Sequence, residues 1–186
     1  MKILLIGANG EIGKILHPAL AKNHEIISVG RNSGDFRIDL SDSNSIEKLF
    51  EEVKNIDACI CVAGDCYTGD LLSLDEKKLN IGIQNKLLGQ VNLVLIGQKY
   101  LSDNGSFTLT SGKMGDKPLK NNISKAIVNG AINSFVFAAS LELDRGIRIN
   151  AISPSKVADI PIEDLINAYA KSIEETINGE IIKVNY

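Results

Sequence analysis

The sequence predicts a single α/β domain in which helices cover both faces of a doubly wound, seven-stranded parallel sheet. Short β-type apolar runs alternate with longer stretches of helical periodicity along the whole chain. The first run, KILLI at 2–6, is continuously apolar, as expected of a strand buried on both faces of a sheet. A length of 186 residues without repeats or low-complexity segments is typical of one domain spanning 1–186.

The elements follow in a regular order. After the first strand a helix runs to about residue 23, and a short helical pattern lies at 43–53. The motif SLDE at 73–76 has the spacing of a capping box and predicts the start of a long helix over 75–101. An apolar helix is expected at 121–143, and the last helix, from about 161, is expected to end at the stop signal Asn178-Gly179. The remaining strands are expected at 25–30, 36–40, 57–62, 105–111, 146–153 and 180–184.

Composition narrows the class of protein. Hydrophobic residues make up 44% and charged residues 23%, which is ordinary for a globular protein, and the net charge is −3. Such a charge provides no basic field for nucleic acid or an acidic membrane. The chain lacks an apolar run of about 18 residues and a signal-peptide pattern. We therefore expect a cytoplasmic protein with neither nucleic acid nor membrane as a partner.

The chain has three cysteines, Cys59, Cys61 and Cys66, and an odd number argues against a complete disulfide framework. A zinc site would need a fourth ligand, and the only histidines, His17 and His24, lie in another element. We expect reduced, buried thiols and no metal.

A glycine-rich turn directly follows the first strand. In GANGEIG, Gly7, Gly10 and Gly13 have the spacing of a dinucleotide-binding loop that leads into a helix. Glycine allows the backbone to approach a pyrophosphate, and free N–H groups of the first helical turn attract its charge. Glu11 would repel that phosphate unless it points outward. The loop predicts a Rossmann-type nucleotide site.

The end of the second strand indicates which nicotinamide cofactor is preferred. NAD-binding proteins usually place an acid here for the ribose hydroxyls, whereas SVGRNSGD offers Arg31, Asn32 and Ser33. A guanidinium and a hydroxyl suit a 2′-phosphate, so NADP(H) is favoured over NAD(H). Asp35 is the residue that would favour NAD(H) instead.

Several stretches together resemble the short-chain dehydrogenase/reductase family over nearly the full chain. They are the glycine loop, Asp39-Leu40, CVAG at 61–64, TLTSG at 108–112 and LELDRGIRINAISP at 141–154. The resemblance implies an oxidoreductase acting on a small carbonyl or alcohol. It also implies cofactor contacts at Gly7, Asn9, Gly10, Ile12, Gly13, Arg31, Asn32, Ser33, Asp39, Leu40, Ala63, Gly64, Pro154 and Val157.

The family's catalytic tyrosine and lysine are replaced here. Ser111 stands at the serine position, but NNISKAIVNG at 121–130 admits two alignments. In one, Lys125 is the catalytic lysine and Asn121 replaces the tyrosine. In the other, which fits the spacing to LEL at 141–143 without a gap, Lys125 replaces the tyrosine and Asn129 the lysine. We favour the second alignment.

The family's catalytic asparagine is also replaced. Counting back three residues from Gly89 puts Lys86 at that position, with Asn85 beside it. Only 24 residues separate Pro154 from Gly179, which leaves little chain for the family's substrate lid. The catalytic candidates are therefore Ser111, Lys125, Asn129 and Lys86.

Two functions remain open at this stage: an NADP(H)-dependent oxidoreductase with altered catalytic residues, and a non-catalytic NADP(H)-binding sensor or assembly protein. The helices at 75–101 and 121–143 are apolar on more than one face, including Phe135, Val136 and Phe137 in succession. The family pairs these helices between subunits, so the resemblance implies a homodimer or homotetramer.

Overall fold

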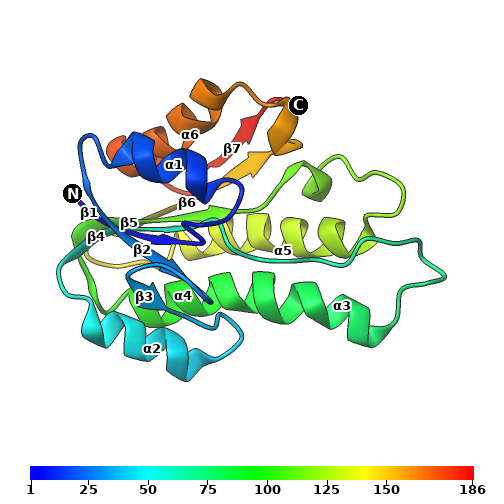
Figure 1. Ribbon diagram of the computed structural model, residues 1–186, viewed down its shortest axis with the longest axis horizontal. Helices are drawn as coiled ribbons and strands as arrows, with labels where there is room; N and C mark the ends of the chain where they lie inside the picture. Colours follow the sequence, from blue (N-terminus) through cyan, green and yellow to red (C-terminus); the bar gives the residue numbers. More distant parts are fainter.

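The computed structural model describes all 186 residues as a three-layer sandwich (Figure 1). Its seven strands are all parallel, which confirms the predicted Rossmann-type α/β fold. In the order β3-β2-β1-β4-β5-β6-β7 they form one sheet. The strands are β1 (Lys2–Ile6), β2 (Glu25–Gly30), β3 (Phe36–Arg37), β4 (Ile56–Cys61), β5 (Leu101–Thr110), β6 (Arg148–Pro154) and β7 (Ile181–Val184).

Helices cover both faces of the sheet, and Figure 1 shows α1 and α6 on one side with α2, α3 and α4 on the other. The bounds are α1 (Gly13–Leu20), α2 (Ser43–Glu52), α3 (Glu76–Gly82), α4 (Gly89–Gly97), α5 (Ile123–Ala139) and α6 (Ile162–Glu174). Strand β1 shows why both faces are covered, because Leu4 and Ile6 enter one buried cluster and Ile3 and Leu5 the other. Its apolar run therefore packs into two cores at once. None of the helices combines the length and the apolar character that crossing a membrane requires.

The order of strands reverses between β1 and β4, since β2 and β3 lie on one side of β1 and the later strands on the other. In open parallel sheets, ligands bind beyond the carboxyl ends of the strands at such a switch point. The segments at 62–75 and 112–122 follow β4 and β5 and extend beyond this edge in Figure 1. They touch each other there, because the N–H of Gly69 donates to the carbonyl of Asn121 at 2.9 Å.

The predicted helix at 75–101 differs from the observed one in three ways. A π-helix, Ile83–Leu88, interrupts it between α3 and α4, and the helix ends at Gly97. The N-cap is Asp75, whose carboxylate accepts from the N–H of Lys78 at 2.8 Å. Ser73 therefore does not cap this helix, because its hydroxyl donates to the carbonyl of Asp70.

Other boundaries also differ between the predicted and the observed elements. Strand β3 has two residues instead of five, β5 begins at Leu101, and α5 is shorter at both ends than 121–143. The last helix ends at Glu174, before the glycine that the sequence suggested as its stop. The side chain of Asn178 instead accepts from the N–H of Ile149 at 2.9 Å, which ties this turn to β6.

Candidate active site

The glycine loop between β1 and α1 is a tight backbone turn. Gly7 has φ +90° and donates its N–H to the carbonyl of Val29 at 2.8 Å. A Cβ on Gly13 would lie 2.2 Å from the carbonyl oxygen of Gly7, so a side chain there cannot be accommodated without moving the loop. Ile12, at the N-cap of α1, makes no side-chain cap, and Glu11 is exposed. The N–H groups of Lys14 and Ile15 already donate to the carbonyls of Gly10 and Ile12, whereas those of Glu11, Ile12 and Gly13 have no acceptor and are available to an anion.

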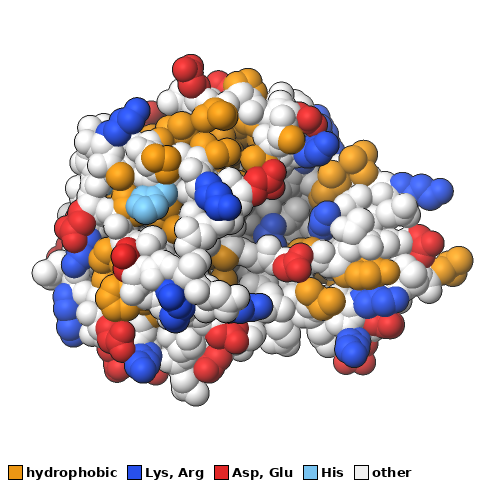
Figure 2. All heavy atoms as spheres, in the orientation of Figure 1, with side chains coloured by type: hydrophobic (Ala, Val, Ile, Leu, Met, Phe, Trp, Pro, Cys, Tyr) orange, Lys and Arg blue, Asp and Glu red, His pale blue; other side chains and the backbone are white.

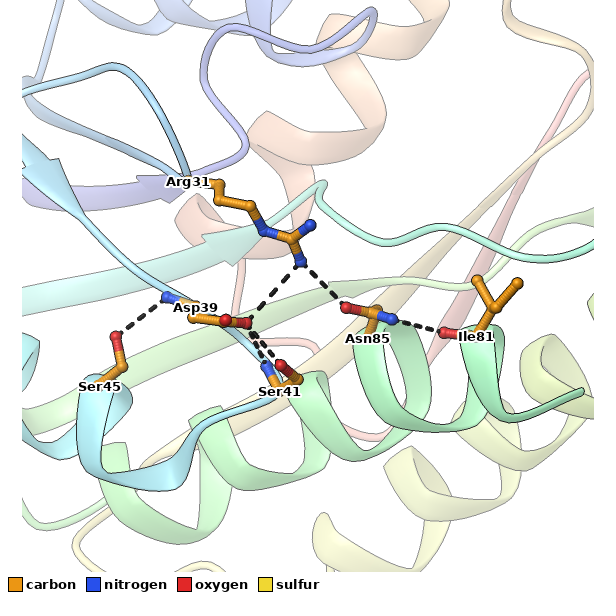
Figure 3. A network of polar contacts seen from close by, with 6 residues as sticks. All are labelled: Arg31, Asp39, Ser41, Ser45, Ile81 and Asn85. Carbon is orange, nitrogen blue, oxygen red and sulfur yellow. Dashed lines mark hydrogen bonds and ion pairs between the residues drawn. The ribbon is translucent and has the colours of Figure 1, made fainter. Parts of the chain in front are cut away.

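A cavity of about 430 Å³ lies beside this loop and is bounded by the ends of β1, β2 and β4. Arg31 is part of its lining. Figure 3 shows its guanidinium directed toward Asn85, to whose Oδ1 it donates at 3.0 Å. The same guanidinium lies 3.8 Å from the carboxylate of Asp39. The Ser41 hydroxyl and N–H, and more weakly Arg31, lower the pKa of Asp39 below its ordinary value. The rest of the lining comes from strand ends and nearby turns: Ile6, Gly7, Gly30, Ile38, Leu40, Ala63, Gly64, Asp65 and Ile81.

The turn after β2 is held by side-chain contacts. Asp35 accepts from the N–H and the hydroxyl of Ser28, at 2.8 and 2.7 Å, and these contacts lower its pKa. Ser33, by contrast, accepts from the amide of Asn9 at 2.7 Å, which joins the turn to the glycine loop. Asn32, between Arg31 and Ser33 in the sequence, is exposed. Asp35 is therefore committed to the strand, whereas Arg31 is held only by weak, exposed contacts.

A second cavity, of about 820 Å³, shares Gly7, Ala63 and Gly64 with the first, so the two form one continuous groove across the carboxyl edge of the sheet. Figure 2 shows a hollow on this face of the molecule. Of the residues predicted from the sequence, this cavity brings together Gly7, Gly10, Ile12, Ala63, Gly64, Lys86, Ser111, Lys125, Asn129, Pro154 and Val157. Gly13 is buried beneath the loop. Four further predicted residues line neither cavity: Asn9, Asn32, Ser33 and Asp39.

Lys86 and Asn129 meet across the floor of this cavity. The amine of Lys86 donates to Oδ1 of Asn129 and to the carbonyl of Ser111, both at 2.8 Å. Two of its three N–H groups are thereby used, and one remains. Desolvation by burial is the main cause that lowers the pKa of Lys86, and Lys125 acts in the same direction. The thiols of Cys66 and Cys61 act against this shift.

The backbone makes room for this amine in two places. The π-helix places Lys86 opposite the end of β4, and π segments inside α-helices occur frequently at functional sites. Gly64 has φ +143°, and a Cβ there would lie 2.6 Å from Cγ of Lys86. Glycine at this position therefore allows the lysine stem to cross the strand end.

Ser111 and Lys125 face the same cavity without strong partners. Ser111 is 3% exposed, and its hydroxyl has only a long contact of 3.5 Å with the carbonyl of Ile152. Lys125 has no carboxylate within salt-bridge distance. Asn121, the tyrosine replacement in the other alignment, precedes α5 with φ +68° and does not line the cavity.

Sequence reasoning missed several lining residues, among them Lys113, Met114, Leu119, Asn122 and Lys156. Lys113 and Lys156 each stand two residues after a residue that the resemblance had marked, Ser111 and Pro154. Their position just past the carboxyl end of a strand was the signal that could have identified them. The three cysteines are free thiols, with Cys59 and Cys61 buried and Cys66 half-buried near the cavity.

Comparison with known proteins agrees with this arrangement. The model of a family described as enoyl-(acyl carrier protein) reductase matches residues 16–184. The short-chain dehydrogenase/reductase ATR9 of Stachybotrys chlorohalonatus is 29% identical over 180 residues, covering 88% of this chain and 69% of that protein. The chain belongs to the short-chain dehydrogenase/reductase family of oxidoreductases.

Solved structures show the same likeness over the whole chain. The protein lin1944 from Listeria innocua is 38% identical with a TM-score of 0.95, and the match covers 100% of both chains. A small-chain dehydrogenase in complex with NADPH is 26% identical with a TM-score of 0.89, covering 100% of this chain and 96% of that one.

Proposed function

We propose that this protein is an NADP(H)-dependent oxidoreductase that interconverts a small carbonyl compound and its alcohol. The observation that carries the proposal is the continuous groove, which joins the Arg31 end of the sheet to the cavity holding Ser111, Lys86 and Lys125. Its length and its position at the switch point suit an extended dinucleotide. A likeness to a protein solved with NADPH supports the same choice of cofactor.

The residues present fit a dinucleotide. The N–H groups of Glu11, Ile12 and Gly13, where the glycine loop enters α1, have no acceptor, and these would hold the pyrophosphate. Leu40 and Ile38 give the smaller cavity an apolar wall that suits an adenine ring. Asp39, at the edge of that cavity, would accept from the adenine amino group, which the family resemblance also implies.

Preference for the 2′-phosphate of NADP(H) is supported by the turn after β2. Asp35, the acid that could have bound the ribose hydroxyls of NAD(H), is turned back onto Ser28. Arg31 is 62% exposed, and its ion pair with Asp39 is too solvated to contribute more than about 1 kcal/mol. A phosphate offers this guanidinium a stronger partner, and Ser33 lies on the same turn.

The catalytic roles follow from the larger cavity. When bound, the reduced nicotinamide supplies a hydride to the carbonyl carbon. The hydroxyl of Ser111 would donate to the carbonyl oxygen and hold it in place. The ammonium of Lys125 would give that oxygen the proton that completes the alcohol, and the resulting amine would regain a proton from water through the open mouth.

Lys86 and Asn129 exchange the roles of the family's asparagine and lysine. The resemblance places an amine on α5 and an amide on the preceding helix, whereas here the amine comes from the π-helix and the amide from α5. The direct contact of 2.8 Å between them holds the amine in the cavity from the opposite wall. Its remaining N–H would bind a ribose hydroxyl of the cofactor, and its charge would stabilise developing negative charge.

Cofactor binding is tested first, by thermal shift with NADPH and NADH side by side on the wild type and on Arg31→Ala. A cofactor at a hundred times its Kd stabilises a fold by about 2.7 kcal/mol, which is readily visible in Tm. We expect a shift with NADPH that Arg31→Ala reduces, and a smaller shift with NADH. Equal shifts with both cofactors would contradict the NADP(H) preference, and no shift with either would contradict cofactor binding.

Turnover is tested next, by following NADPH absorbance with a panel of small aldehydes, ketones and oxo acids. We expect Ser111→Ala and Lys125→Met to lose most of the activity while their NADPH-induced Tm shift stays near that of the wild type. Lys48→Met, on the exposed face of α2, is the matched control and should retain full activity.

A non-catalytic NADP(H) binder is the second candidate. It is favoured by the absence of a tyrosine from the cavity lining, since the family's proton donor is a tyrosine. NADPH binding without turnover of any carbonyl compound would support this candidate over the first.

We also propose that the chain forms a homodimer or homotetramer through α4 and α5. Leu95 is 51% exposed and lines a shallow groove between these helices, together with Phe135 and the exposed Ala138 of α5. Leu141, just past α5, is 84% exposed. Light scattering coupled to size exclusion should give a dimer or larger species, and Leu95→Glu with Ala138→Glu should give a monomer. A monomeric wild type would contradict this proposal.

A further inference from the structure

The larger cavity carries an unbalanced charge. Four lysines line it, Lys86, Lys113, Lys125 and Lys156, and the only acid among its lining residues is Glu11. None of the four lysines has a carboxylate within 4.0 Å. This excess of positive charge occurs in a chain whose net charge is −3. Figure 2 shows Lys and Arg side chains within and beside the hollow.

The acid and the lysines lie at different ends of the cavity. Glu11 belongs to the loop after β1, whereas Lys113 follows β5 and Lys156 follows β6. In the sheet, β5 is two positions from β1 and β6 is three. Neighbouring strands are about 4.8 Å apart, so the strand ends differ by about 10–14 Å. The end of the cavity away from the glycine loop therefore has no acidic side chain in its lining.

Cofactor phosphates do not account for all of this charge. In the proposed function, the pyrophosphate faces the glycine loop, the 2′-phosphate faces Arg31, and Lys86 faces the ribose. Lys125 stands at the reacting oxygen. Lys113 and Lys156 remain, and Lys156 stands between Pro154 and Val157, which the family resemblance assigns to the cofactor. The ammonium of Lys113 lies 5.6 Å from the ring centre of Tyr186, on the β6 side of the site.

The segment between β5 and α5 is itself basic. It carries Lys113, Lys117 and Lys120, and its only acid is Asp116. The carboxylate of Asp116 is already paired with Lys183, and this contact is the main reason why the pKa of Asp116 is lowered. Nothing on the segment is left to neutralise Lys113.

We propose that the substrate of this oxidoreductase is a small anionic carbonyl compound, whose carboxylate or phosphate group is bound by Lys113 at the substrate end of the cavity. The inference rests on the proposed function and adds the charge of the substrate to it. An open, partly solvated mouth suits a small charged compound, because both lysine and anion keep part of their hydration.

Matched pairs of substrates test the proposal, because each pair shares a carbonyl and differs in charge. Pyruvate is compared with methyl pyruvate, and dihydroxyacetone phosphate with dihydroxyacetone, as substrates for NADPH oxidation. We expect kcat/KM to be at least tenfold higher for the charged member of one pair, and the pair that responds identifies the anionic group. If the neutral members are turned over as well as the charged ones, the anion proposal is wrong while the oxidoreductase stands.

The role of Lys113 is isolated by Lys113→Gln. This variant should raise KM for the charged substrate about tenfold, the change expected from about 1.4 kcal/mol of binding, without changing kcat or the KM of the neutral substrate. Lys113→Arg should restore the KM, because it keeps the charge. Lys48→Gln is the distant control and should behave as the wild type. An unchanged KM in Lys113→Gln would overturn the assignment.

Calorimetry keeps the inference testable if none of these compounds is reduced. Oxamate, a non-reducible carboxylate, its neutral counterpart oxamide, and inorganic phosphate are titrated into the NADPH-saturated protein. Binding of oxamate or phosphate but not of oxamide, weakened at least tenfold in Lys113→Gln, would support the anion site even though hydride transfer had failed. Absence of binding by both oxamate and inorganic phosphate, or equal binding of oxamide, would overturn it.

Discussion

The contact between Lys86 and Asn129 leads to a quantitative prediction, because both side chains can be exchanged. Lys86→Asn removes the amine and leaves two acceptors, Oδ1 of Asn129 and the Ser111 carbonyl, without their donor. Hydrogen bonds to charged groups contribute about 1.5–3 kcal/mol each, and relief of the buried charge offsets part of the loss. We expect a net decrease of about 2 kcal/mol in the free energy of unfolding.

The other single variant, Asn129→Lys, places a second ammonium against Lys86. Two like charges about 4 Å apart repel by about 4 kcal/mol at an effective dielectric constant of 20. Loss of a proton from Lys86, whose pKa burial already lowers, limits that repulsion. We expect a decrease of about 3 kcal/mol.

The double variant restores one amine and one amide, so its free energy of unfolding should fall by much less than the sum of the two single decreases. We expect it to lie about 2 kcal/mol below the wild type, which corresponds to a coupling energy of about 3 kcal/mol. Urea unfolding of the four proteins at one pH, with equal m-values, gives this coupling directly. Additivity within about 0.5 kcal/mol would refute the view that Lys86 and Asn129 act as a pair.

A control cycle uses Lys48→Asn with Asn129→Lys, since Lys48 is exposed on α2 and pairs with Glu52. That cycle should be additive. NADPH Kd values for the same proteins add a functional measure, and the double variant should bind NADPH more tightly than either single variant.

Three further predictions concern stability and cofactor binding. Gly13→Ala, which puts a Cβ 2.2 Å from a carbonyl oxygen of its own loop, should abolish the NADPH-induced shift in Tm, and an unchanged shift would contradict the loop assignment. Tyr169→Phe removes the hydroxyl that meets Thr110 at 2.8 Å in the core, so it should cost about 1 kcal/mol in urea unfolding and leave the NADPH Kd unchanged. Asp35→Asn should lower Tm at pH 7. Because contacts with Ser28 depress the folded pKa of Asp35, its stabilisation is present above the ordinary pKa of aspartate and lost as pH falls through the folded value. The difference in Tm between the wild type and Asp35→Asn should therefore narrow as pH falls from 7 toward about 3. A constant difference would contradict the ionic origin of the effect.

The fold was predictable because its signals are local and repeated. The continuous apolar run of β1, the glycine loop and the alternation of strands and helices each depend on a few neighbouring residues. The order of the sheet then follows from the family likeness, which spans nearly the whole chain.

The site was predictable only as a set of residues. Ser111, Lys86, Lys125 and Asn129 do line one cavity, but no spacing rule showed that Lys86 and Asn129 would bind each other. That contact depends on two helices distant in the sequence meeting over one strand end. Periodicity also could not reveal the π-helix, because its extra residue is too small a change to alter the apolar pattern of the flanking turns.

The predicted cap at Ser73 was wrong, because the sequence offers two candidate caps close together. The S-x-x-E spacing fitted a capping box, yet Asp75 lies two residues nearer to the helix and is an equally good acceptor. Competing caps of similar quality cannot be ranked from spacing alone, since the choice depends on where Asp70 and the preceding turn lie.

The π-helix affects both the direction of the Lys86 side chain and the packing of the helical turns on either side of it. On its N-terminal side Gly82 packs closely against Val128, and on its C-terminal side Gly89 packs against Leu40. Each residue added to an α-helix turns the following side chains by 100°. Removing one residue from the π segment would therefore force a choice, in which either the amine of Lys86 leaves the cavity or one glycine face turns away from its neighbour. The extra residue of the π-helix therefore lets Lys86 point into the cavity while Gly82 and Gly89 both keep their packing contacts.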